Sequence, residues 1–209
     1  MNAAVLDNAV SAQAIPLPDG TLTLYRDVFK TEHDNLFQAL HTETPWQQQV
    51  ITLYGRAVAS PRLSAWYGDP GAVYRYSGLR LEPLPWTAVL RRIKHRVADL
   101  ATTPFNSALL NLYRDGQDSM GWHSDAEPEL GRNPVIASVS LGAARRFVLR
   151  HKKRTAPSIA LELEPGSVLI MAGALQHHWR HALPKTRQAV GPRINLTFRL
   201  IQRLEQNMT

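Results

Sequence analysis

The chain has 209 residues, with 24 lysines and arginines against 17 aspartates and glutamates, which gives a formal net charge of +7 at pH 7. This length fits one domain that can bury a hydrophobic core without covalent cross-links. The absence of cysteine excludes disulfides, iron–sulfur clusters and thiolate zinc sites. Without a signal-peptide pattern or a bilayer-spanning apolar run, we expect a soluble cytoplasmic protein, nucleoid-associated if bacterial, with no membrane contact. The positive charge favours a polyanionic partner.

The N-terminal part is expected to begin with a flexible leader over residues 1–20, which is rich in alanine and contains two prolines. Thr31 and Asp34 then predict the start of a short helix. That helix is expected to bury three apolar side chains, namely Leu36, Phe37 and Leu40.

Residues 48–78 carry alternating segments broken by glycine and proline, and this pattern predicts strands and hairpins. Pro85 then precedes an amphipathic helix. Its apolar face is formed by Val89, Leu90, Ile93, Val97 and Leu100. Its basic residues are expected on a solvated face, and they are Arg91, Arg92, Lys94 and Arg96.

Beyond Pro104 the pattern is typical of β-structure, with many short strands separated by glycine, proline and aspartate. This favours a sandwich or a barrel, with the two upstream helices bracing one sheet from outside. The expected strands are 108–113, 135–141, 146–150, 159–163, 167–172, 177–183 and 193–200.

The last expected strand separates polar from apolar residues by parity. Arg193, Asn195, Thr197 and Arg199 share one face, because side chains alternate along a strand. Two arginines with two hydrogen-bonding neighbours suit a small dianion. The alternative is a half-exposed strand with a polar outer face.

A second candidate pattern combines a histidine and a carboxylate in His123-Ser124-Asp125 with a distant histidine. Two histidines and one carboxylate on one face of an iron leave other positions open for reactants. The third ligand is His177, His178 or His181, of which the first and last share a face if the segment is a strand. The alternative is a surface histidine beside an aspartate by chance.

These patterns occur together in an order that resembles the AlkB family of Fe(II)- and 2-oxoglutarate-dependent dioxygenases. The matching segments are Asn111-Leu112-Tyr113, Asp115-Gly116, His123-Ser124-Asp125, His178-Trp179-Arg180-His181-Ala182-Leu183-Pro184 and Pro192–Arg199. Further matches resemble the nucleotide-recognition region of the DNA-repair branch, and they are Pro61-Arg62, Tyr67-Gly68-Asp69, residues 74–78 and Pro85-Trp86.

The resemblance implies a mainly β fold with flanking helices, in which a double-stranded β-helix (jelly-roll) core follows an N-terminal nucleotide-recognition region. It implies one dioxygenase domain over residues 21–209, with the helices and recognition region at about 21–107 and the jelly roll at about 108–209. The implied Fe(II) ligands and catalytic residues are His123, Asp125 and His181. The implied 2-oxoglutarate contacts are Asn111, Tyr113, Arg193, Asn195, Thr197 and Arg199, and O2 is the second co-substrate.

The implied reaction is oxidative demethylation of N-alkylated bases in DNA, of the 1-methyladenine and 3-methylcytosine type, with release of formaldehyde. The implied substrate contacts are Tyr74, Tyr76, Glu127, Arg62 and Ser77. Leu53 and Tyr54 fall where a relative inserts a base-stack finger, and we expect a monomer that binds nucleic acid, most simply DNA.

Other functions remain open alongside this one. The same oxygenase chemistry could act on RNA, protein or a small metabolite, or the chain could be a silent barrel that only binds nucleic acid. The complete ligand and arginine sets argue against the silent barrel. Residues 150–154 are a basic run expected at a hairpin tip, for phosphate contact or as a solvated loop. Strand preference stays open, since Trp122 precedes the metal histidine and the loop after Arg150 is short.

Overall fold

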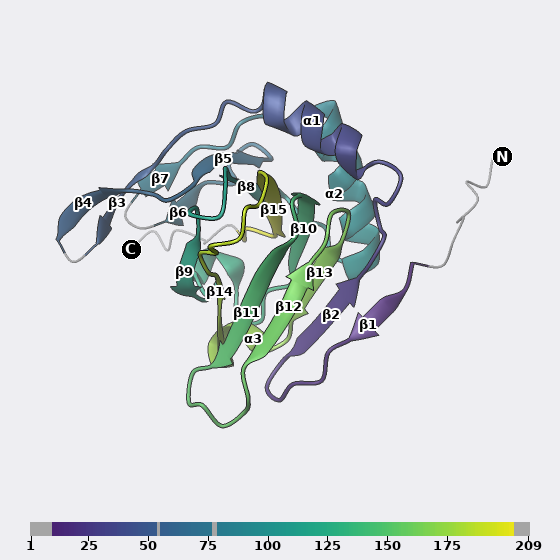
Figure 1. The fold of residues 1–209 in the computed structure, drawn as a ribbon, viewed down its shortest axis with the longest axis vertical. Coiled ribbons are helices and arrows are strands. Elements are labelled where there is room, and N and C mark those ends of the chain that lie inside the picture. Colours follow the sequence, from purple (N-terminus) through teal and green to yellow (C-terminus); the bar gives the residue numbers. More distant parts are fainter. Residues whose placement is uncertain (1–9, 54, 77–78, 203–209) are drawn as a thin grey trace, which may run out of the picture.

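The computed structural model describes residues 10–53, 55–76 and 79–202. Its two larger sheets have seven and four strands, and Figure 1 shows the long helices packed against one side of the sheets. The helices are α1 (His33–Glu43), α2 (Ala88–Ala101) and the short α3 (Leu175–His178), with a 3-10 turn, η1 (Pro128–Leu130). Among the described residues, none of these helices is long and apolar enough to cross a membrane.

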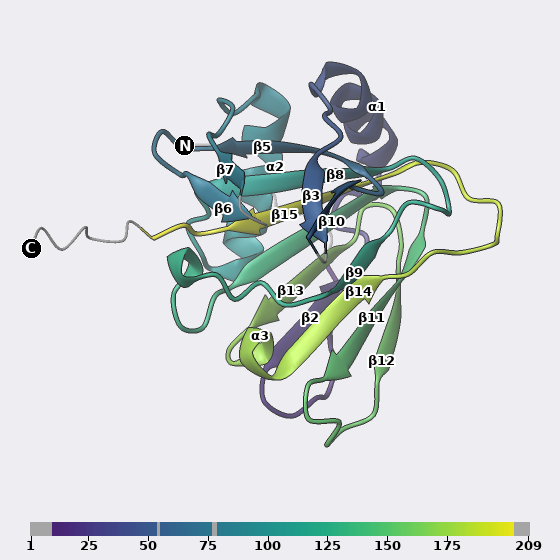
Figure 2. The ribbon, with the colours of Figure 1, turned by 90° about the vertical axis from the view of Figure 1, so that its left-hand side faces the viewer.

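The larger sheet has the strand order β1-β2-β13-β10-β15-β8-β5. Its strands are β1 (Ala12–Ala14), β2 (Thr21–Tyr25), β13 (Val168–Ala172), β10 (Ile136–Gly142), β15 (Arg193–Arg199), β8 (Ser107–Tyr113) and β5 (Leu63–Gly68). The smaller sheet has the order β12-β11-β14-β9, and Figure 2 shows it lying across the larger one. Its strands are β12 (Ile159–Leu163), β11 (Arg145–His151), β14 (Trp179–Leu183) and β9 (Met120–His123).

From β8 onward the chain crosses from one sheet to the other at almost every connection, and only the β11–β12 hairpin stays within one sheet. This is the jelly-roll arrangement, so the expected mainly β fold with a double-stranded β-helix core is confirmed. Two separate hairpins precede it. They are β3 (Val50–Leu53) with β4 (Arg56–Ala59), and β6 (Tyr74–Tyr76) with β7 (Leu79–Leu81).

Most predicted elements are found within a residue or two of their expected bounds, but the expectations for two segments are wrong. Residues 177 and 178 belong to α3 instead of the expected strand, which begins only at Trp179. The expected flexible leader of residues 1–20 also includes β1, whose Gln13 pairs with Leu24 of β2. Backbone pairing with the edge of the large sheet orders this segment despite its composition.

The two large helices begin differently. Thr87 caps α2, since its hydroxyl oxygen accepts a hydrogen bond from the Leu90 amide at 3.2 Å. Before α1 the cap position is Glu32, with no side-chain cap hydrogen bond, so Thr31 does not start that helix as expected. The predicted apolar face of α1 is confirmed, because Leu36, Phe37 and Leu40 are buried.

On α2 the apolar face is also confirmed, with Leu90, Ile93 and Val97 fully buried. One basic residue departs from the expected solvated face. The Lys94 ammonium lies 3.3 Å from an Asp69 carboxylate oxygen and 4.8 Å from the centre of the Trp86 ring. The lysine therefore connects α2 to the loop that follows β5.

The central strands of the large sheet are buried on both faces. Its outer face packs against α1 and α2 through one apolar cluster, which includes Leu110, Val139 and Leu196. Its inner face shares a second apolar cluster with the smaller sheet, which includes Leu109 and Phe147. Every residue of β15 is buried, which excludes the half-exposed strand considered above. Its polar residues therefore face the space between the sheets.

Candidate functional site

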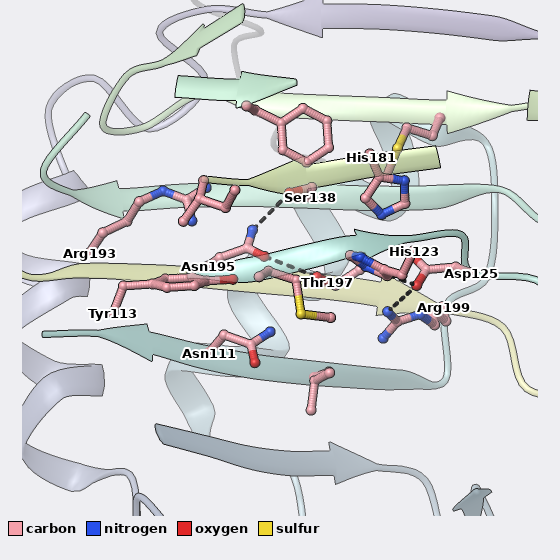
Figure 3. A pocket seen from close by; sticks show the side chains of 15 residues that line it. Asn111, Tyr113, His123, Asp125, Ser138, His181, Arg193, Asn195, Thr197 and Arg199 are labelled. Atoms are coloured by element: carbon pink, nitrogen blue, oxygen red, sulfur yellow. Dashed lines mark hydrogen bonds and ion pairs between the residues drawn. The ribbon is translucent and has the colours of Figure 1, made fainter. Parts of the chain in front are cut away.

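A cavity lies between the two sheets, and Figure 3 shows the polar side chains that point into it. Strands of both sheets contribute, so residues far apart in the sequence meet there. The lining residues are Leu109, Asn111, Tyr113, Met120, His123, Asp125, Ser138, Phe147, Met171, His181, Leu183, Arg193, Asn195, Thr197 and Arg199.

Two histidines and one carboxylate gather at one end of this cavity. His123 ends β9 and is paired in register with His181 of β14, so their ring centres are only 4.2 Å apart. The His123 Nε2 and Asp125 Oδ1 atoms are 3.9 Å apart, and one ligand atom from each of the three residues lies within 4.8 Å of the others. This donor set fits the facial triad of non-haem iron enzymes.

The charges around the triad favour the forms that bind a metal. Burial opposes ionisation of Asp125, but the positive charges of Arg199, His181 and His123 outweigh it and lower the pKa of that carboxyl to about 2. Burial, followed by the charge of His123, lowers the pKa of His181 to about 3. At neutral pH the site therefore holds a carboxylate and a neutral His181 imidazole, as metal ligation requires.

Neighbouring groups fix the orientation of two ligands. The His123 Nδ1 atom lies 2.8 Å from the Gly121 carbonyl oxygen, and donation there leaves Nε2 facing Asp125. The backbone amide of Asp125 donates to the Gln176 side-chain oxygen at 2.9 Å. Sequence reasoning missed Gln176, because it belongs to the short helix α3 and no local pattern links it to Asp125.

The polar face of β15 lines the rest of the cavity. The Arg199 guanidinium donates to Asp125 Oδ1 at 3.0 Å, so this arginine is at the metal end. Asn195 donates to the Ser138 hydroxyl at 2.7 Å and accepts from the Thr197 hydroxyl at 3.1 Å. Ser138 was not predicted. A signal for it exists in the sequence, because the serines of the otherwise apolar strand β10 alternate, and they pair with polar residues of β15.

Arg193 lies at the opposite end, beside Tyr113 (Figure 3). Arg193 is 2% exposed, and its guanidinium donates to the Ser140 hydroxyl at 2.9 Å and lies 5.5 Å from the centre of the Tyr113 ring. Burial lowers the pKa of Arg193 to about 10. Within the described part of the chain its Nε has no hydrogen-bond partner and no carboxylate forms an ion pair with it. This cation is therefore available to a ligand.

Asn111 and Tyr113 both line the cavity, as their shared strand face predicts. Register pairs Asn111 with Asn195 and Tyr113 with Arg193 across β8 and β15. Arg62, expected to contact substrate, is instead 6% exposed and donates from Nε to the Asn111 side-chain oxygen at 2.8 Å. It supports the cavity wall from behind Asn111.

The choice among three histidines is decided by the fold. His181 lies in the cavity, whereas His177 and His178 belong to α3 and do not line it. The parity argument that placed His177 with His181 was wrong, because it assumed a continuous strand. His177 instead interacts with the Arg132 carbonyl oxygen.

The remaining expected substrate contacts are placed only in part. Glu127 is half-buried just before η1 and does not line the cavity. Tyr74 and Tyr76 form the ends of β6, with Leu53 at the end of β3. Tyr54 and Ser77 lie outside the described residues.

Comparison with known proteins agrees with this site. The family model of the 2OG-Fe(II) oxygenase superfamily matches residues 21–199. The chain is 41% identical to the DNA oxidative demethylase ALKBH2 of Mus musculus, over 82% of this chain and 76% of the relative. It is also 41% identical to the alpha-ketoglutarate-dependent dioxygenase alkB homolog 3 of Homo sapiens, over 81% of this chain and 62% of the relative.

The solved structure of OsALKBH1 supports the same fold. It superposes with a TM-score of 0.66 at 15% sequence identity, covering 90% of this chain and 100% of that chain. The enzymes of the matched superfamily use Fe(II), 2-oxoglutarate and O2, for which the cavity holds the ligand triad and two buried arginines. The chain belongs to the 2OG-Fe(II) oxygenase superfamily and, within it, to the AlkB family of dioxygenases.

Proposed function

We propose that the protein is a DNA repair enzyme that oxidatively demethylates N-alkylated bases of the 1-methyladenine and 3-methylcytosine type and releases formaldehyde. The observation that carries this proposal is the His123, Asp125 and His181 triad in one cavity with Arg193 and Arg199. The similarity to DNA oxidative demethylase ALKBH2 supplies the substrate class.

The triad residues would hold Fe(II), which with 2-oxoglutarate and O2 supplies the oxidising chemistry. The protein contributes position and charge. Arg199 keeps Asp125 ionised, and the carbonyl oxygen of Gly121 holds the His123 ring so that Nε2 faces the carboxylate. The apolar side chains of Met171, Phe147 and other lining residues limit water beside the reacting atoms.

The two arginines would hold opposite ends of 2-oxoglutarate. Arg199 is hydrogen-bonded to Asp125 at the metal end, so it suits the carboxylate nearer the metal. Arg193 has no carboxylate partner among the described residues and suits the distal carboxylate, where its planar fork can donate twice. Asn111, Tyr113, Asn195 and Thr197 would line the chain between them.

Several exposed groups support nucleic-acid binding outside the cavity. Trp122 is 42% exposed next to His123, and the Arg150 guanidinium lies 4.5 Å from the centre of its ring. Residues 150–154 cover the end of β11 and the start of the β11–β12 turn, and the exposed residues 152–154 suit contact with phosphates. An aromatic ring with a cation beside it suits a stacked base.

The β3–β4 hairpin supports a role for Leu53 and Tyr54 as a base-stack finger. Val50 and Val58, on its two strands, are 56% and 42% exposed. These two valines belong to adjacent cross-strand pairs, and the side chains of adjacent pairs point to opposite faces of a hairpin. Each face therefore presents an apolar side chain. Apolar side chains on a narrow projection can fill the gap left by a flipped base.

A flipped base would meet the β6 region and the end of the metal motif. Tyr74 and Tyr76 are the proposed stacking residues, with Ser77 beside them. Glu127 is proposed to favour a cationic methylated base, and Arg62 to act by supporting Asn111. One chain supplies the whole metal and 2-oxoglutarate site, so a monomer is sufficient.

The test is mass spectrometry of a 1-methyladenine oligonucleotide incubated with the protein, Fe(II), ascorbate, O2 and 2-oxoglutarate. Loss of the methyl group only with 2-oxoglutarate is expected, with no loss in the Asp125→Ala variant. An unchanged oligonucleotide with continued succinate formation would reject this substrate. Parallel single-stranded, duplex and RNA oligonucleotides then identify the preferred strand.

A further inference from the structure

A second group of metal-ligand side chains lies outside the cavity, in Asp19, His151 and His178. One ligand atom from each of these residues lies within 4.8 Å of the others, as in the iron triad. They come from three segments, namely the loop before β2, the end of β11 and α3. The proposed demethylation uses none of them. We propose that this cluster is a second divalent-metal site that takes Zn²⁺.

The distances suit a small tetrahedral ion. His151 Nε2 is 3.3 Å from Asp19 Oδ2, and His178 Nδ1 is 4.0 Å from the same oxygen. Ligand atoms on a tetrahedral Zn²⁺ are separated by roughly 3.4 Å, which follows from metal–ligand distances of about 2.1 Å. The second distance therefore needs a shift of about half an ångström when an ion binds.

The His151 ring is oriented as a metal ligand would be. It is 2% exposed, and its Nδ1 lies 2.8 Å from the Thr155 hydroxyl oxygen. With a metal ion bound at Nε2, the ring proton would be on Nδ1, where it can be donated to this hydroxyl. An outer hydrogen-bond partner of this kind on the other ring nitrogen is typical of metal-bound histidine.

The backbone also holds the cluster together from outside. Trp179 donates from its indole nitrogen to the Pro18 carbonyl oxygen at 2.9 Å, which fixes the loop that carries Asp19. The Lys152 amide donates to the His178 carbonyl oxygen at 2.7 Å and joins α3 to the β11–β12 hairpin. Asp19 and His178 have side-chain exposures of 46% and 38%, so an ion can enter from solvent and keep a water ligand.

A metal ion at the second site would stabilise the local structure and would take no part in the oxidation. α3 carries both His178 and Gln176, and Gln176 accepts the hydrogen bond from the Asp125 amide. An ion at the second site would therefore fix α3 between two neighbouring segments, beside the ligand set of the iron site. The expected chemistry is ligation by two imidazoles and one carboxylate, which suits Zn²⁺ better than Mg²⁺ or Ca²⁺.

The test is a count of bound metal in tag-free full-length protein that has been stripped with a chelator, saturated with Zn²⁺ and desalted. Elemental analysis and native mass spectrometry should find two Zn²⁺ per wild-type chain. Asp19→Asn and His178→Ala should each retain one, as should Asp125→Ala through loss of the iron site. The Asp19→Asn and Asp125→Ala double variant should retain none.

Two matched controls test whether the effect is local. Asp27 is another exposed aspartate with φ of 59°, the same as Asp19, and His177 is the exposed neighbour of His178. Asp27→Asn and His177→Ala should keep two Zn²⁺. A single Zn²⁺ on the wild type, two on Asp19→Asn, or a loss from the control variants would each overturn the second site.

A stability measurement gives an independent readout that does not depend on demethylation. In the Asp125→Ala background, Zn²⁺ should raise Tm by several degrees, because an ion that binds only the folded state stabilises it. The added Asp19→Asn change should abolish this rise while leaving Tm in chelator unchanged. A Zn²⁺-induced rise that survives Asp19→Asn would contradict the assignment, whatever the outcome of the oligonucleotide assay.

Discussion

Replacing Arg193 with methionine separates a ligand-binding role from a structural one. The depression of its pKa from 12.5 to about 10 corresponds to a cost of about 3 kcal/mol for keeping the buried cation charged. Against this, the variant loses one hydrogen bond to Ser140, worth about 1 kcal/mol, and the cation–π contact with the Tyr113 ring, worth about another 1 kcal/mol. We therefore expect the metal-free variant to be about 1 kcal/mol more stable than the wild type.

The same change should weaken 2-oxoglutarate binding. Loss of one partner of a buried charge pair costs about 2 kcal/mol or more, which corresponds to at least about a 30-fold rise in Kd. Stability is measured by urea unfolding in chelator. Binding is measured by calorimetry with Mn²⁺ replacing Fe(II), so that no turnover occurs.

Arg145→Met is the matched control, because Arg145 is also buried, with 3% exposure, but its guanidinium donates several hydrogen bonds within the protein. Its guanidinium donates to the carbonyl oxygens of Asp115, Asp118 and Pro184 at 3.0, 3.0 and 2.9 Å. Its removal leaves these oxygens without that donor, so we expect a loss of at least about 2 kcal/mol. If Arg193→Met were equally destabilising and left the Kd unchanged, the ligand-binding role would be refuted.

Three further changes have defined outcomes. In metal-free protein, His181 of the unfolded chain takes up a proton below its usual pKa, whereas the folded residue, whose pKa is lowered to about 3, stays neutral. The free energy of unfolding therefore falls as pH decreases. Between pH 7.5 and 5.0, urea unfolding should show a loss of about 2 kcal/mol, which the His181→Asn variant should not show. The Gly142→Ala variant should lose at least about 2 kcal/mol of unfolding free energy in the same assay. Gly142 has φ of +79°, and a Cβ there would lie 2.5 Å from the Pro192 carbonyl oxygen and 2.7 Å from the Phe37 ring. An unchanged urea midpoint would contradict this prediction. Trp122→Ala should weaken single-stranded oligonucleotide binding at least about fivefold by fluorescence anisotropy at fixed salt, whereas Trp122→Phe should not, and equal affinities would exclude stacking there.

Strand parity was the most informative property of the sequence. It correctly placed Arg193 and Arg199 on one face with Asn195 and Thr197, because β15 is regular over its whole length. The same reasoning failed for His177, since parity has meaning only within a strand and α3 ends immediately before β14. A one-turn helix of four residues carries no periodic signal of its own.

Other features depend on contacts between distant segments, which no local pattern contains. β1 is composed of Ala-Gln-Ala and is ordered by pairing with β2. Arg62 lies near the nucleotide-recognition motifs in sequence, yet it hydrogen-bonds Asn111, 49 positions away. Composition cannot distinguish such a buried arginine from an exposed one that contacts DNA.

The charges of the residues that line the cavity explain why Arg193 has no carboxylate partner among the described residues. Two buried guanidinium groups and one buried carboxylate give a net charge of +1 when the histidines are neutral, and only Arg199 is paired with Asp125. Fe(II) raises this sum to +3, and a 2-oxoglutarate dianion returns it to +1. Buried without a carboxylate from the described part of the chain, Arg193 lowers the stability of the empty protein, and ligand binding offsets this loss. A fold selected for stability alone would place an apolar residue there, as the outer face of the same strand does with Leu196.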